Sequence, residues 1–281
     1  MSLYYEPWLE FQHTLVRQLA FTIASPNIIC QLPVTLQIEH PFQLHSNHQW
    51  VQFYQTYQPR LRQLDQDPTE LLQFMQRLKS TRLGLRFEYL MWFWLQDQAH
   101  HDLQLLAHGL QIIEGHHTLG ELDFLVRNPI TRQVEHWEVA LKYYLAEQDL
   151  TLSQWYGLNR SDTLSRKLHH FTRKQFQFQQ VPDYPIEQKF AVMKGQLYLP
   201  LQHPNEPLPA WLNPTRRHGH WGSEMLSPYY RLQRYEWLCP DPQPTSTQTQ
   251  VWGDGLYFNP IQNHYYMFRM PQIRYPYVTQ L

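Results

Sequence analysis

The sequence predicts a mixed α/β protein with a central sheet flanked by helices, because the spacing of its apolar residues changes twice. Between residues 82 and 98 they recur every three or four positions, which is typical of a helix. Further on they alternate with polar residues, which is typical of strands, and helical spacing returns at 161–179. The predicted strands cover residues 103–114, 121–127, 134–145 and 189–199. The order helix, three strands, helix and strand favours a mixed α/β core.

The residues before this core are expected to be mainly helical. Apolar side chains at helical spacing predict a helix over 6–23, which ends at Ser25-Pro26-Asn27. Two further helices are predicted over 48–60 and 68–78, and the segment 28–45 is expected to be irregular, with at most one short strand. Residues 1–81 therefore form an N-terminal helical extension in this interpretation.

The last part of the chain is rich in Pro, Trp and Tyr and shows little periodicity. Helical spacing is indicated only over 223–237, and the polar stretch 241–250 is typical of a loop. We therefore expect a single domain over residues 1–281, with its core over 82–200 and an irregular C-terminal elaboration over 201–281.

The composition argues against several classes of protein. The formal net charge is −1, whereas a protein that binds nucleic acid through charge alone is usually more basic. Two cysteines cannot build a disulfide framework. The first ten residues do not resemble a signal peptide, and the longest dense apolar run, 89–95, is too short to cross a bilayer. We therefore expect a cytoplasmic protein without a membrane partner.

The predicted strands 121–127 and 134–145 each carry acidic residues on one face. Side chains alternate along a strand, so Glu121 and Asp123 point away from the apolar face of the first strand. In the second strand, Glu138 and Lys142 share a face in the same way. Acidic residues on one strand face also fit an ordinary solvated surface, so the alternation alone leaves both interpretations open.

The register of the predicted hairpin brings two of these acids together. If Asn128 and Gln133 close the turn, Asp123 lies directly opposite Glu138. Cross-strand neighbours have Cβ atoms about 4.5–5.5 Å apart. Two carboxylates at that distance repel each other unless a cation lies between them, and Mg²⁺ prefers such oxygen ligands. The hairpin therefore predicts a site for a divalent cation.

A third carboxylate lies upstream, in the most apolar helix of the chain. Glu88 stands between Phe87 and Tyr89. Charged residues are rarely buried without a partner, so Glu88 needs a cation or donors nearby if it faces inward. Alternatively it is solvated, or it pairs with Arg82 or Arg86.

This combination of residues resembles the PD-(D/E)XK nuclease superfamily. That superfamily places a Glu on an N-terminal helix, an Asp on the second core strand and a (D/E)xK motif on the third. The matching segments are 84–90 around Glu88, 120–126 around Asp123 and 136–142 around Glu138. The motifs look closest to an uncharacterised bacterial family of restriction-endonuclease-like proteins. The resemblance to that family extends over most of the chain.

The resemblance implies a restriction-endonuclease-like core and a Mg²⁺-dependent nuclease that acts on DNA or RNA. Asp123, Glu138 and Glu88 would then hold Mg²⁺ or Mn²⁺, and Lys142 would position or activate the attacking water. Together these four form the expected catalytic set. The helix after residue 160 would present Lys167, Lys174 or Gln175 to the substrate. Arg166, Lys167, His170 and Lys174 can share one helical face, although such a face is also typical of a solvated surface.

One departure from the superfamily pattern keeps other functions open. The usual lysine stands two residues after the acid, where this chain has Ala140. Lys142 lies on the same face but about 6.6 Å further along the strand. A catalytically inactive nuclease-fold protein that serves as a binding or structural module is therefore an alternative. A glycoside-type hydrolase with Asp123 and Glu138 as its acid–base pair is another, but it leaves Lys142 and Glu88 without a clear task.

Overall fold

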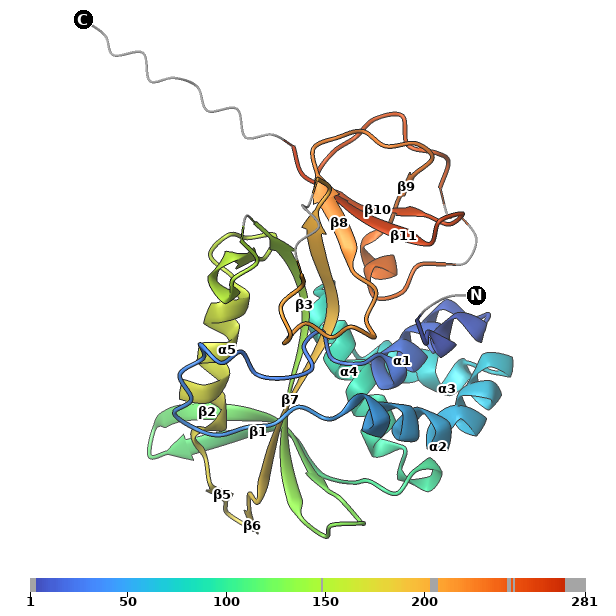
Figure 1. Cartoon of the computed structure of the whole chain (residues 1–281). Helices are drawn as coiled ribbons and strands as arrows, with labels where there is room; N and C mark the ends of the chain where they lie inside the picture. The colour runs from blue at the N-terminus through green and yellow to red at the C-terminus, as the bar shows by residue number, and fades with distance from the viewer. Residues whose placement is uncertain (1–3, 148, 203–206, 242–243, 245, 271–281) are drawn as a thin grey trace, which may run out of the picture.

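The computed structural model describes residues 4–147, 149–202, 207–241, 244 and 246–270. A large mixed sheet runs through the middle of the molecule in the order β1-β2-β3-β7-β8-β11-β10-β9, with β4 paired to β3 (Figure 1). Its strands are β1 (Gln104–Glu114), β2 (His117–Arg127), β3 (Val134–Ala146), β4 (Trp155–Tyr156), β7 (Gln188–Pro200), β8 (Gly219–Gly222), β9 (Tyr230–Arg231), β10 (Gly255–Asn259) and β11 (His264–Phe268). A separate small sheet pairs β5 (Gln180–Val181) with β6 (Tyr184–Pro185).

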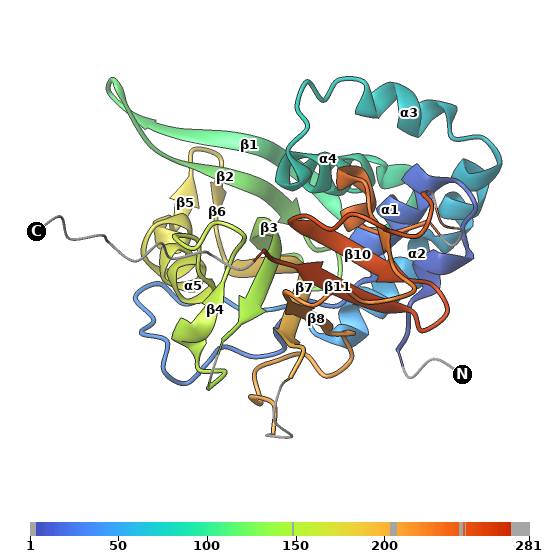
Figure 2. The same ribbon diagram turned by 90° about the horizontal axis from the view of Figure 1, so that it is seen from above.

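The centre of the sheet joins an antiparallel part to a parallel one. The β1–β2 and β2–β3 pairs are antiparallel, and β3 pairs with β7 in parallel along most of its length. The β1–β2 hairpin extends as an arm beyond the rest of the molecule (Figure 2). Parallel strands need a crossover, and here the helix α5 (Leu164–Arg173) supplies it between β3 and β7.

Helices cover both faces of this central part (Figure 1). One face carries α4 (Leu83–Gln96), packed with α1 (Thr14–Ala24), α2 (Asn47–Gln66) and α3 (Thr69–Met75), and the other carries α5. Alternation along β3 divides its side chains between them. Trp137 and Leu141 join the core cluster that contains α4, whereas Ala140 and Tyr144 join the cluster that contains α5.

Three predicted helices have different bounds in the structure. The first is divided into a short 3₁₀ helix, η1 (Pro7–Glu10), and α1. The second, α2, begins with a capping box at Ser46 and continues through Pro59 to Gln66, because buried residues on both sides of the proline pack into the core. The third, α5, ends at Arg173, and a short 3₁₀ helix, η4 (Gln175–Gln177), follows it.

The C-terminal part differs most from the prediction. It contributes β8 to β11 to the main sheet, where an irregular elaboration was expected. The predicted helix over 223–237 was wrong, because that segment contains only β9 and the 3₁₀ helix η5 (Arg234–Trp237). These strands are short, and β10 is buried along its whole length, so no alternating pattern marks it. Among the described residues, no helix is long and apolar enough to cross a membrane.

Candidate active site

The β2–β3 hairpin has the predicted register. The N–H of Asn128 donates to the carbonyl of Gln133 at 3.0 Å, and Phe124 lies opposite Trp137. The pairing of the two strands stops at that pair. One residue further, the Asp123 Oδ2 atom accepts the backbone N–H of Val139 at 2.8 Å. The Asp123 carboxylate thus replaces a backbone acceptor where the two strands cease to pair.

Glu138 is fully buried, and it lies close enough to Asp123 for the two carboxyl groups to interact directly. Its Oε1 atom lies 2.6 Å from His136 Nε2, and its Oε2 atom accepts a hydrogen bond from the side-chain amide of Gln175. Gln175 belongs to η4, just after α5. The Asp–Glu pair is therefore enclosed on the face of the sheet that α5 covers.

Both carboxyl groups bind their protons unusually tightly. Burial raises the pKa of Asp123 to about 8, and repulsion from Glu138 and then Glu88 adds to this. Burial also raises the pKa of Glu138 to about 8, against the attraction of the Lys167 ammonium. An isolated carboxyl group titrates near pH 4. The pair is thus unstable as two bare anions near neutral pH and favours a proton or a cation between them.

The positive charge of Lys167, in α5, lowers the pKa of both Asp123 and Glu138. Its Nζ atom donates to Gln175 Oε1 at 2.8 Å and lies 4.0 Å from the centre of the Phe171 ring. Burial lowers the pKa of Lys167 to about 8, although Glu138 draws it upward. A lysine and two carboxyl groups therefore titrate in the same pH range, a feature more common at functional sites than elsewhere.

Lys142, the expected catalytic lysine, has a different partner. Its Nζ atom forms an ion pair with Asp162 Oδ2 at 2.7 Å, and the Tyr144 hydroxyl donates to the other oxygen of Asp162 at 3.3 Å. Lys142 thus lies on the same face as Glu138, but a carboxylate from the loop before α5 holds it. The charge of Lys167, which was predicted only as a substrate contact, acts on both Asp123 and Glu138, whereas that of Lys142 is paired with Asp162.

Glu88 lies close enough to influence Asp123 but bonds elsewhere. Its Oε1 atom is 3.0 Å from His108 Nε2, and the His108 ring stacks on Trp92 with the ring centres 4.2 Å apart. The negative charge of Glu88 contributes to the raised pKa of Asp123. The three predicted acids are therefore electrostatically coupled, although only Asp123 and Glu138 are in contact.

His136 is a site residue that the sequence interpretation missed. It is fully buried, and burial lowers its pKa to about 3, so the ring is neutral. Its Nδ1 atom has no hydrogen-bond partner among the described residues. Strand alternation could have identified it, because His136 stands two residues before Glu138 and therefore shares its strand face.

An open cleft of about 500 Å³ borders the site along α5. Five Lys and Arg side chains but only one carboxylate, Asp162, line it. The cationic lining residues are Lys142, Arg166, Lys167, Arg173 and Lys174. Cationic side chains are thus clustered at this cleft, although Lys142 pairs with Asp162 and Arg173 pairs with Glu39.

Comparison with known proteins shows the family of this chain. Residues 17–256 match the family described as a domain of unknown function (DUF1853). The chain belongs to that family. No curated protein and no solved structure gives a significant match. The region shared with DUF1853 contains every site residue described above, and the match to that family assigns it no activity.

The site offers two carboxyl groups to a hard divalent cation, but no larger set of ligands among the described residues. No three His, Cys, Asp or Glu side chains converge into a metal-binding group in the described part of the chain. Mg²⁺ is usually held by one or two carboxylates, with water and substrate phosphate as its other ligands. Asp123 and Glu138 provide one pair of carboxyl groups, and burial is the largest cause that raises the pKa of each to about 8.

Proposed function

We propose that this DUF1853 protein is a metal-dependent nuclease that hydrolyses phosphodiester bonds in DNA or RNA. The observation that carries the proposal is the contact between Asp123 and Glu138, with both pKa values raised to about 8. A divalent cation would relieve their repulsion and replace the proton. The order α4, β1, β2, β3, α5 and β7 supports a restriction-endonuclease-like core, which is part of the proposal.

In this proposal Asp123 and Glu138 hold Mg²⁺ or Mn²⁺. A bound ion of this kind lowers the pKa of water and polarises a phosphoryl oxygen. Glu88 adds negative charge next to the ion and is itself oriented by His108. His136 and Gln175 hold the Glu138 carboxylate in place through its two oxygens.

We assign the role of the usual motif lysine to Lys167. Because its pKa is about 8, it can hold or release a proton near neutral pH. In its charged form it would stabilise negative charge that develops on the phosphate. Lys142 and Lys174 line the adjoining cleft, where they would contact the nucleic-acid backbone.

One set of contacts favours a second candidate function, a nuclease fold that binds without cleaving. Both oxygens of Glu138 already have protein partners, and Lys142 is paired with Asp162. A site whose side chains satisfy one another can persist as a structural feature. This candidate predicts nucleic-acid binding without metal-dependent hydrolysis.

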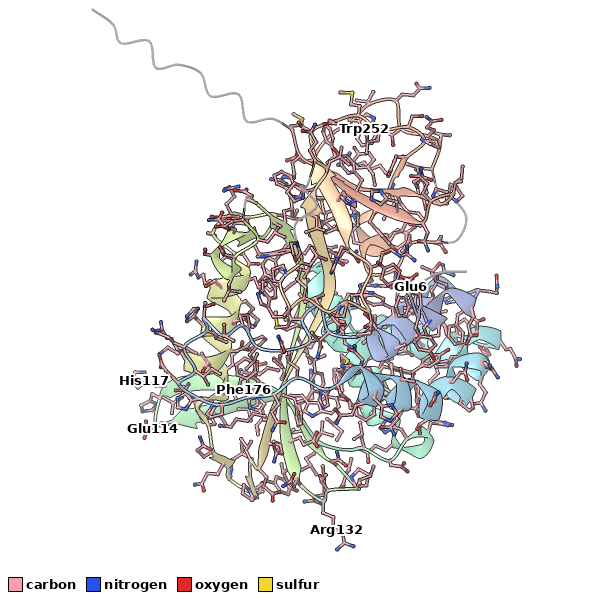
Figure 3. The ribbon with its side chains drawn as sticks, in the orientation of Figure 1. Glu6, Glu114, His117, Arg132, Phe176 and Trp252 are labelled. Atoms are coloured by element: carbon pink, nitrogen blue, oxygen red, sulfur yellow. The ribbon has the colours of Figure 1, made fainter. Side chains whose placement is uncertain are left out.

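Cleavage assays distinguish the two candidates. The full chain is incubated with plasmid DNA, single-stranded DNA or RNA, in Mg²⁺, in Mn²⁺ and in EDTA. Metal-dependent cleavage that is lost in Asp123→Asn and Glu138→Gln supports the nuclease. Glu114→Gln is a matched control, because it removes one exposed carboxylate at the end of the β1–β2 arm (Figure 3), where Glu114 pairs with His117, six residues along β2 from Asp123. Binding by the wild-type protein without cleavage under any condition would support the binding module instead.

A further inference from the structure

Two adjoining cavities lie between the C-terminal strands and the segment that precedes α5. The first, of about 390 Å³, is lined by Arg231, Arg234, Arg269 and Trp237, among others. The second, of about 340 Å³, is lined by Arg160 together with Tyr156 and Trp221. Asp254 and Arg269 belong to both linings, so the two cavities form one elongated depression, which we call the arginine groove.

The arginine groove has more positive charge than its own acids neutralise. Of its four guanidinium groups, Arg160 pairs with Glu147, and Arg269 lies 3.4 Å from Asp254. Within the described ranges, Arg231 and Arg234 have no carboxylate partner. Arg231 donates to the backbone carbonyl of Asp254 at 2.6 Å, and no hydrogen bond to described residues holds Arg234. Two guanidinium groups therefore remain for an anionic ligand.

Two of the four guanidinium groups in the groove stack on aromatic rings. Arg234 lies 4.0 Å from the centre of the Trp237 ring, and Arg160 lies 4.3 Å from that of Tyr156. A guanidinium group stacked in this way keeps its N–H groups in its own plane, where they can donate to phosphate oxygens. Partly exposed rings such as Tyr156 and Trp221 also suit stacking with nucleic-acid bases.

The groove adjoins the cleft of the candidate active site through one short segment. Tyr156, Gly157 and Arg160 line the groove, whereas Ser161 and Asp162 line the cleft. The positive surface therefore runs from Lys174, beside α5, past this segment to Arg234 in η5. Cationic residues that line three neighbouring hollows are more than one phosphate group can contact, and they suit an extended polyanion.

We propose that the arginine groove binds the phosphodiester backbone of a nucleic-acid strand some distance from the bond that is cleaved. This inference rests on the proposed function and extends it, because it names where the rest of the substrate lies. Binding in the groove needs no catalysis, so the two proposals can fail separately.

The test measures binding of a labelled single-stranded DNA of about 20 nucleotides by fluorescence anisotropy, in EDTA and over a series of salt concentrations. Each phosphate contact with a single strand contributes about 0.7 to the slope of log K against log salt concentration. We expect Arg234→Gln to reduce that slope by about this amount and to weaken binding several-fold at moderate salt. Arg234→Lys, which retains the charge, should have a slope of log K against log salt concentration close to that of the wild type.

Arg132→Gln is the matched control, since Arg132 is exposed at the β2–β3 turn, at the opposite end of the molecule from the C-terminal strands (Figure 3). The groove proposal is overturned if Arg234→Gln binds the long strand like Arg132→Gln, or if the wild-type protein does not bind it. Absence of metal-dependent cleavage, with the slope effect intact, would contradict only the nuclease.

Discussion

The carboxylate of Asp123 accepts the backbone N–H of Val139 at 2.8 Å, at the point where β2 and β3 stop pairing. This bond holds Asp123 next to Glu138, the residue before Val139. The bond to Val139 lowers the pKa of Asp123, but burial and the neighbouring carboxylates outweigh it. The bond to Val139 therefore fixes the position of the carboxyl group but does not keep it ionised. As a result, its charge depends on the pH and on nearby cations.

Metal ions should stabilise the folded protein through this pair. At a free Mg²⁺ or Mn²⁺ concentration of 100 times its Kd, a single site adds about 2.7 kcal/mol to the free energy of unfolding. We expect thermal denaturation to show this stabilisation in the wild type and in Glu114→Gln, and to show none in Asp123→Asn or Glu138→Gln. An equal rise in Tm for all four proteins would mean that the ion binds elsewhere.

The stability of the metal-free protein should fall as the pH rises from about 4 towards 8. The pKa of Asp123 and that of Glu138 are each raised to about 8, whereas carboxyl groups in the unfolded chain titrate near 4. Between those values the folded state holds protons that the unfolded state has lost, so raising the pH favours unfolding. Urea denaturation across this range should show the slope, and Asp123→Asn should reduce it. A profile unchanged by the substitution would contradict the assigned pKa values.

Lys167 should matter more for cleavage than Lys142. Replacement of Lys167 by Met removes the one ammonium group, among the residues that the structure describes, whose charge is linked to the pKa of both carboxylates. We expect a loss on the order of 100-fold in single-turnover rate. Lys142→Met leaves Lys167 in place and should have a smaller effect. The pH–rate profile separates a positioning role from a structural one, because loss of Lys167 should shift the apparent pKa values of the acids upward. Equal rates for Lys167→Met and the wild type would restore Lys142 as the better candidate.

Gly195 should be essential for the register of β3 and β7. Its φ is +118°, and an added Cβ atom would lie 1.9 Å from the carbonyl oxygen of Lys142. Since backbone cannot move away as a flexible side chain can, Gly195→Ala should destabilise the protein by on the order of 3 kcal/mol or more. Gly84→Ala, in the first turn of α4 where the added atom meets nothing within 4 Å, is the control and should leave the stability unchanged or raise it slightly. Similar stabilities for the two variants would contradict the close approach of these strands.

The sequence by itself determined the helix α4, the β2–β3 hairpin and the face that Asp123 and Glu138 share. These features depend on local rules, because side chains alternate along a strand and a short turn sets the register of its two arms. The spacing of Asp123, Asn128, Gln133 and Glu138 was therefore sufficient to place the two acids together.

Only the tertiary structure decided which lysine accompanies these acids and how the C-terminal part folds. Lys167 occupies the core-facing stripe of α5 with Leu164 and Phe171, but its distance from Glu138 depends on how α5 crosses the sheet. Likewise, β8 pairs in parallel with both β7 and β11, so its place depends on strands distant in the chain. Such long-range packing cannot be predicted from the periodicity of the sequence. The register of a hairpin can be, because it depends on a few residues close together in the chain.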